Sequence, residues 1–146
     1  MKLYLDTIIN SIILTLAILL IGIESGTSQS IAISSKSGNK AETIKGQSGG
    51  SIDSKGCGFI ASSPNYTINL PQRIDYMRLT VETAGGQPTL LVLGPNPGDS
   101  FCVLGDEVSG LKPEISGVWE AGQYQIYIGD RIGENYQFTL NISTDN

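Results

Sequence analysis

The sequence contains no histidine among its 146 residues. Histidine most often supplies general acid–base catalysis near neutral pH and is a common zinc and copper ligand. Its absence excludes Ser-His-Asp and Cys-His nucleophiles and His-ligated metal centres. Positive charge is also scarce, since 9 Lys and Arg stand against 14 Asp and Glu and the net charge is −5. This balance argues against nucleic acid as a partner, because nucleic acid requires a basic surface.

Long apolar runs are scarce too, because residues 8–23 (IINSIILTLAILLIGI) form the only one. Lys2 precedes this run and the small and polar residues ESGTSQS follow it, which is the order of a secretory signal. A membrane-spanning helix needs about 20 mostly apolar residues, so the run is short for a permanent anchor. We expect residues 1–28 to form a signal helix that directs export to the periplasm, the cell envelope or the medium. A retained membrane anchor is the alternative.

Cysteine occurs only twice, as Cys57 and Cys102. Two thiolates are too few for a zinc site built from four. A single pair in an exported chain indicates a disulfide, and the alternative is two buried free thiols. A bond between them would stabilise the domain by about 4 kcal/mol in the chain-entropy model. We therefore expect Cys57 to be bonded to Cys102.

Large apolar side chains are sparse in residues 29–54, which are rich in serine and glycine. Such a stretch buries too little surface to offset the entropy that is lost on ordering. We therefore expect residues 29–54 to be a flexible linker. Two short pieces within it, residues 31–33 and 43–44, have enough apolar character to add an edge strand.

Beyond the linker, short apolar runs alternate with clusters of glycine, proline and asparagine. Residues 75–83 place Met77, Leu79 and Val81 on one face and polar side chains on the other, which is the period of a half-buried strand. Residues 89–93 (TLLVL) are continuously apolar, as expected for a central strand that is covered on both faces.

The number and spacing of these runs define the fold class. About seven or eight strand-like segments separated by turns are typical of a β-sandwich or barrel. No segment after residue 30 shows the period of a helix. We expect residues 55–146 to form one all-β domain, an antiparallel jelly-roll-like sandwich that follows the signal helix and the linker.

Four segments of the C-terminal half combine apolar strands with an acidic loop and an AGxY turn: PTLLVLGP (88–95), FCVLGDE (101–107), WEAGQYQIYIGD (119–130) and ENYQFTLNIS (134–143). In this order they resemble the bacterial pre-peptidase C-terminal domain, a jelly-roll-like β-sandwich, over residues 66–143. The resemblance implies an exported bacterial module of the kind that accompanies secreted enzymes, and some members bind calcium or matrix polymers. Members of that family accompany an enzyme, but we expect no catalytic domain in this chain. We therefore do not assign the family's role in targeting an attached enzyme to this protein.

The acidic loop gives one candidate site. Asp106 and Glu107 follow Gly105, and Asp99 and Glu114 lie in flanking loops. Calcium takes six to eight oxygen ligands, several of them from carboxylates. The hypothesis is a calcium site at Asp99, Asp106 and Glu107, which Glu114 could join. The alternative is a solvated turn.

Aromatic side chains give a second candidate. Tyr76 and Tyr127 fall on the faces opposite the core alternation, and Arg78 shares the face of Tyr76. Tyr76, Arg78 and Glu82, which share one face, are the candidate recognition patch, and Tyr127 is a separate candidate for an exposed binding aromatic. The alternative is a partly solvated sheet face. Trp119 is the only tryptophan, and we expect it to fill the edge of the core rather than to stack on a ligand.

The function that the sequence favours is a non-catalytic exported module of the cell envelope that binds a protein or an extracellular polymer. The signal, the cysteine pair, the resemblance and the lack of histidine motivate it. The first alternative is a membrane-tethered structural subunit that touches the membrane only through its N-terminal segment. The second is a hydrolase that uses paired carboxylates. The only cofactor suggested is calcium.

Overall fold

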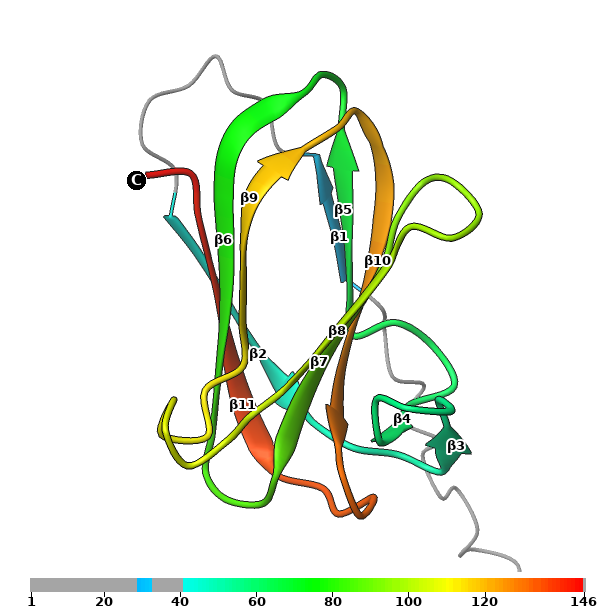
Figure 1. The fold of residues 1–146 in the computed structure, drawn as a ribbon, viewed down its shortest axis with the longest axis vertical. Helices are drawn as coiled ribbons and strands as arrows, with labels where there is room; N and C mark the ends of the chain where they lie inside the picture. Colours follow the sequence, from blue (N-terminus) through cyan, green and yellow to red (C-terminus); the bar gives the residue numbers. More distant parts are fainter. Residues whose placement is uncertain (1–28, 33–40, 146) are drawn as a thin grey trace, which may run out of the picture.

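The computed structural model describes residues 29–32 and 41–145, and these residues form strands, turns and loops without a helix. Two sheets stack as a sandwich (Figure 1), which confirms the predicted all-β fold class. The predicted signal helix over residues 1–28 lies outside the described residues. Within the described residues, no helix is long and apolar enough to cross a membrane.

The smaller sheet has the strand order β2-β11-β6-β9, and all its pairings are antiparallel. Its strands are β2 (Ala41–Gln47), β6 (Ile74–Thr83), β9 (Glu114–Trp119) and β11 (Gln137–Ser143). Here β2 and β9 are the two edges. In β6 the register slips between Ile74 and Met77, where the strand is irregular opposite β9.

The larger sheet is organised around β10 (Gly122–Asp130), which pairs with β5 (Tyr66–Leu70) on one side and β7 (Pro88–Leu93) on the other. The strand β8 (Ser100–Leu104) adds to β7, and β1 (Gln29–Ala32) adds to β5. The pairing of β1 with β5 is parallel, which departs from the purely antiparallel sandwich that we predicted. Two short strands, β3 (Ile52–Asp53) and β4 (Phe59–Ile60), attach at the end of β10.

The inner faces of the two sheets form the core. Met77, Leu79 and Val81 of β6 have no exposed surface, as their alternation predicted. The larger sheet contributes Ile126 and Ile128 from β10, which are equally buried. This packing hides one side of nearly every long strand, and apolar burial of this kind is the main driving force of folding.

The segment predicted to be a flexible linker contributes strands, so that prediction is wrong for residues 41–54. The strand β2 pairs with β11 from Ala41 to Gln47, and Ile44 is buried in the core. Of the two short pieces singled out in the sequence, residues 43–44 fall on the edge strand β2 and residues 31–32 on the edge strand β1, whereas residue 33 lies outside the described residues. The low apolar content concealed β2 because an edge strand needs few inward side chains, and Ile44 supplies the central one.

The outer face of the larger sheet carries a second, smaller apolar cluster under the β3–β4 hairpin. Cys57 is bonded to Cys102 of β8, with the two Cα atoms 5.7 Å apart, so the predicted disulfide is confirmed. The Thr89 hydroxyl donates a buried hydrogen bond of 2.7 Å to the Cys57 carbonyl. The hairpin is therefore held onto the sheet by one covalent bond and by polar contacts beneath it.

Replacement of Ile44 tests whether β2 belongs to the folded domain. We expect Ile44→Ala to lower the free energy of unfolding by about 2–5 kcal/mol, because it leaves a cavity in the core. Lys45→Ala, at the exposed neighbouring position, should change it by less than about 0.5 kcal/mol. Urea unfolding of both variants measures this. Equal urea midpoints for Ile44→Ala and the parent protein would show that residues 41–47 are a linker and not part of the folded domain.

Candidate functional site

The candidate site lies between two edge strands, β8 of the larger sheet and β9 of the smaller sheet, on the same side of the sandwich. Within the described residues, β8 pairs only with β7, and β9 pairs only with β6. A hollow of about 290 Å³ lies between them, and residues of both strands line it. We call this hollow, with its rim, the β8–β9 groove. Its lining is Asp99, Phe101, Ile115, Ser116, Gly117, Val118, Trp119, Glu120 and Tyr124.

The groove exists because Gly117 occupies an inward position on β9. Ile115 and Trp119 flank it on the same face, and both point toward the core. A Cβ atom placed on Gly117 would meet no heavy atom within 4 Å. The φ of Gly117 is +145°, a backbone conformation that favours glycine.

The opposite edge of the same sheet shows how such a gap is normally filled. Gly46 takes an inward position on β2, next but one to Ile44. A Cβ there would lie 2.8 Å from the Phe138 ring, which occupies the space. The ring of Phe138 thus closes one edge of the sandwich, whereas none of the described residues closes the other edge over Gly117.

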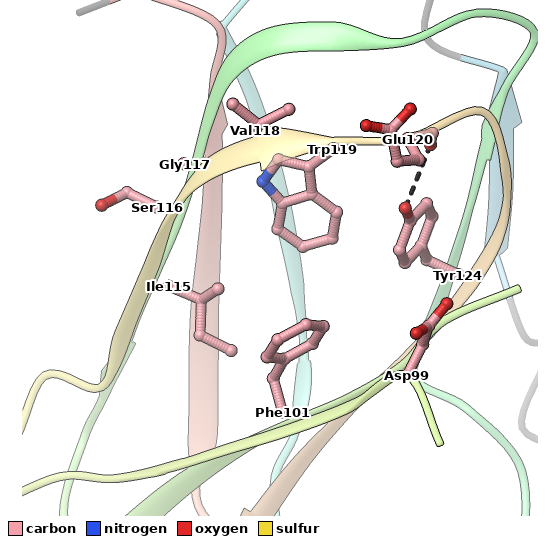
Figure 2. A pocket seen from close by; sticks show the side chains of 9 residues that line it. All are labelled: Asp99, Phe101, Ile115, Ser116, Gly117, Val118, Trp119, Glu120 and Tyr124. Atoms are coloured by element: carbon pink, nitrogen blue, oxygen red, sulfur yellow. Dashed lines mark hydrogen bonds between the residues drawn. The ribbon is translucent and has the colours of Figure 1, made fainter. Parts of the chain in front are cut away.

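Phe101 and Trp119 form facing walls of the groove, one from each sheet (Figure 2). The Phe101 side chain points toward β9 and yet is 53% exposed. Trp119 is 5% exposed, its Nε1–H donates to the Met77 carbonyl at 3.0 Å, and its ring meets Tyr124 edge-on at 4.9 Å. Trp119 is therefore a core residue, as predicted, whereas Phe101 is an apolar wall that the fold leaves uncovered.

The rim of the groove is acidic at the end nearest Tyr124. Asp99 and Glu120 are its charged lining residues, and none of the described Lys or Arg residues lines it. One Asp99 oxygen accepts from the Asn96 side-chain amide at 2.8 Å, and Glu120 pairs with Arg73 at 3.6 Å. The Tyr124 hydroxyl donates to the Glu120 carbonyl at 3.0 Å (Figure 2). Burial is the main reason that the pKa of Tyr124 lies above its ordinary value, so the phenol stays neutral.

The predicted binding residues lie on the outer faces of both sheets. Tyr76 and Arg78 are on the outer face of the smaller sheet, with the guanidinium 5.6 Å from the Tyr76 ring centre and 3.4 Å from Glu114. Tyr127 is on the outer face of the larger sheet and is only 9% exposed, because it packs with Cys57 and neighbours under the β3–β4 hairpin. The prediction of an exposed Tyr127 is therefore wrong.

The three predicted calcium ligands do not meet either. Asp99 precedes β8 and Asp106 follows it, so the length of the strand separates them. The Asp106 carboxylate accepts from the Ser109 backbone N–H at 2.6 Å, which is the main reason that its pKa lies below the ordinary value. No group of three acidic or thiol side chains among the described residues is placed to hold a metal ion. Calcium binding at Asp106 and Glu107 alone stays a prediction.

Sequence reasoning missed three residues that matter here. Phe101 precedes Cys102, and the predictions for this segment concern the disulfide, the family resemblance and the acidic loop. Gly117 lies between apolar residues, where a glycine indicates a weak strand rather than a hollow. The third is Asp130, whose buried carboxylate accepts hydrogen bonds from the backbone N–H groups of Gln87 and Ile132, at 2.8 and 2.9 Å.

Comparison with known proteins places the chain in a family. An uncharacterized protein of Synechococcus elongatus is 41% identical over 104 residues, which cover 68% of this chain and 73% of the relative. The chain belongs to the family of this protein. No protein-family model matches it.

Solved structures show where the fold of this family recurs. The pre-peptidase C-terminal domain of a collagenase from Bacillus anthracis matches 80% of this chain and 96% of that domain, with a TM-score of 0.53 and 15% identity. At this identity the likeness concerns the fold alone, and it agrees with the architecture that the sequence resemblance implied. Salmonella Typhimurium PliG, a periplasmic inhibitor of g-type lysozyme, matches 80% of this chain and 97% of that protein, with 15% identity and a TM-score of 0.41. That likeness is too distant to carry a statement about function.

The two walls of the groove should respond differently to truncation. Trp119→Ala should lower the free energy of unfolding by about 3–5 kcal/mol, because it removes a buried ring and leaves the Met77 carbonyl unpaired. Phe101→Ala removes a ring that is half in water and should cost less than about 1 kcal/mol. Chemical denaturation of both variants measures the difference. A large loss for Phe101→Ala would make Phe101 a core residue and not a binding wall.

Calcium binding can be tested by melting the protein with calcium and with a chelator. A site at Asp106 and Glu107 would raise the Tm in calcium, because the ion binds only the folded state. Asp106→Asn should then abolish the rise, whereas Asp99→Asn, at the other end of β8, should keep it. The same Tm in calcium and in chelator would leave the loop as a solvated turn.

Proposed function

We propose that this protein is a non-catalytic, exported binding module and that the β8–β9 groove receives a protein partner. The observation that carries the proposal is Phe101, an aromatic side chain that faces an empty inward position at Gly117 and stays half in water. Exposed apolar surface beside a hollow is the usual mark of an interaction site. A partner that covers Phe101 would complete the core of the sandwich.

Export is supported by the disulfide between Cys57 and Cys102, because such bonds persist in oxidising compartments. The signal-like residues 1–28 point in the same direction. The protein then acts in the periplasm, at the cell envelope or outside the cell.

A binding role is favoured over catalysis by the chemistry of the groove. The sequence has no histidine to act as a base. A glycoside hydrolase needs two carboxyl groups on either side of one bond. The carboxylates at this groove, Asp99 and Glu120, are instead held by Asn96 and Arg73 at the rim.

A protein partner is favoured over a polysaccharide by the burial of Trp119. Sugar rings stack on exposed aromatic faces, and the Trp119 indole is packed against Tyr124 inside the sandwich. The hollow that remains is lined largely by apolar side chains, which suits an aliphatic or aromatic side chain.

Selection from a phage library of random peptides, with a glycan array in parallel, tests this function. We expect the parent protein to enrich peptides, and Phe101→Ser to weaken their binding about tenfold or more, as at a hot spot of an interface. The matched control is Ile132→Ser, an exposed apolar residue (61% exposed) outside the groove lining. Bound peptides should be recovered uncleaved, because the proposed module is not catalytic. Binding only to glycans, or peptide binding that Phe101→Ser leaves unchanged, would overturn the proposal.

The tethered alternative depends on residues 1–28, which lie outside the described residues. The intact mass of the protein recovered from cells distinguishes a membrane-tethered subunit from a released module. A mature N-terminus near residue 29 or 31 would support a released module.

A further inference from the structure

We infer that the β8–β9 groove takes an extended, cationic polypeptide segment that pairs with β9 as an additional strand and inserts one apolar side chain beside Gly117. This inference rests on the proposed function of the groove as a protein-binding site. It adds the backbone geometry of the ligand, the position of its anchoring side chain and the sign of its charge.

The first support is the hydrogen-bonding register of β9. The Val81 N–H donates to the Pro113 carbonyl at 3.1 Å, which makes these residues a hydrogen-bonded pair. Hydrogen-bonded pairs alternate with non-bonded pairs along an antiparallel ladder. The backbone N–H and C=O groups of Ile115 and Gly117 therefore also point toward β6. Glu114, Ser116 and Val118 therefore turn their N–H and C=O groups toward the open edge, which is the template for an added strand.

The second support is that β9 lacks the protection that edge strands usually carry. Such strands are commonly guarded against pairing by a lysine or a proline within the strand. The other edge of this sheet, β2, has the exposed Lys45 near its middle. The sequence of β9 is EISGVW, with neither lysine nor proline, and Val118 is exposed.

The third support is the position of the hollow relative to an added strand. The residue of that strand opposite Gly117 would occupy a non-hydrogen-bonded pair, in which side chains approach most closely. Its side chain would point inward, like the missing side chain of Gly117, and would meet Phe101 from the facing sheet (Figure 2). A volume of about 290 Å³ accommodates a leucine or phenylalanine side chain there.

The fourth support is charge. Asp99 and Glu120 stand at the rim without a lining Lys or Arg, and the whole chain carries a net charge of −5. Exposed carboxylates speed the approach of a cationic segment and disfavour an acidic one. Arg73 pairs with Glu120 but lies outside the lining, so it neutralises the rim only in part.

Synthetic peptides test the inference on the domain from residue 29. The parent peptide alternates threonine and lysine around a central leucine. We expect it to shift the amide resonances of Ser116, Gly117 and Val118 in a titration followed by NMR. Exchange of leucine for glycine, or of the lysines for glutamates, should weaken binding about tenfold.

Two controls isolate pairing through the backbone. A peptide that is N-methylated on the amides facing β9 should lose binding, whereas one methylated on the opposite edge should bind like the parent. On the protein side, Ser116→Pro removes an N–H from the open edge without removing a bond to β6, and it should lose binding. Ser116→Thr should keep it. Melting curves confirm that both variants are folded.

Each other outcome has a definite meaning. Equal binding of the two methylated peptides would overturn strand addition. A dimer that Ser116→Pro converts to a monomer would show that the occupant is a second copy of this chain, which also overturns the inference. If no synthetic peptide binds while library-selected peptides still require Phe101, the inference fails and the proposed function stands. If Phe101→Ser changes the binding of neither the synthetic peptides nor the library-selected peptides, both the inference and the proposed function fail.

Discussion

The sandwich depends on the packing of two inner faces, because each sheet is apolar on the side that meets the other. An inward position on a strand is normally filled, either by its own side chain or by one from a neighbouring strand or from the facing sheet. Phe138 fills the space over Gly46 at one edge. In the part of the chain that the structure describes, no side chain does so over Gly117 at the other edge, and this difference leaves Phe101 exposed beside a hollow. The candidate site is thus an incomplete part of the core rather than an addition to its surface.

The outer face of the larger sheet is completed by other means. The Cys57–Cys102 bond attaches the β3–β4 hairpin to β8, so Leu91 and Tyr127 are covered by residues that precede them in the chain. The buried Asp130 carboxylate accepts backbone N–H groups from Gln87 before β7 and Ile132 after β10. A buried carboxylate is stable only when its oxygens are bonded in this way. The two devices fix the larger sheet firmly, and they leave its edge strand β8 well placed to hold Phe101 in position.

Much of the fold was predictable from local patterns, and the site was not. The alternation of Met77, Leu79 and Val81 determines which face of β6 is buried, and it needs no knowledge of the partner sheet. The Cys57–Cys102 disulfide was predictable because the chain has only two cysteines and carries a signal-like segment that indicates export to an oxidising compartment. The strand β2 was hidden because its stretch has few large side chains, although its backbone pairs with β11 along its whole length and Ile44 is buried in the core. The burial of Tyr127 and the opening over Gly117 depend on which distant segment lies across from them, and a single sequence does not contain that information.

The location of a binding site on this molecule is decided by which polar and apolar groups are still unsatisfied. On the outer face of the smaller sheet, Arg78 pairs with Glu114 and Lys112 with Glu82, so a ligand there would have to displace existing contacts. The outer face of the larger sheet is covered by the hairpin near Tyr127. Along β9, by contrast, a partner strand exchanges water for backbone hydrogen bonds and removes the Phe101 ring from water in the same step. Both changes favour binding: each backbone hydrogen bond to the added strand contributes about 1 kcal/mol net, and burial of the half-exposed Phe101 ring contributes part of the roughly 1.5–3 kcal/mol that full burial of a large apolar side chain provides.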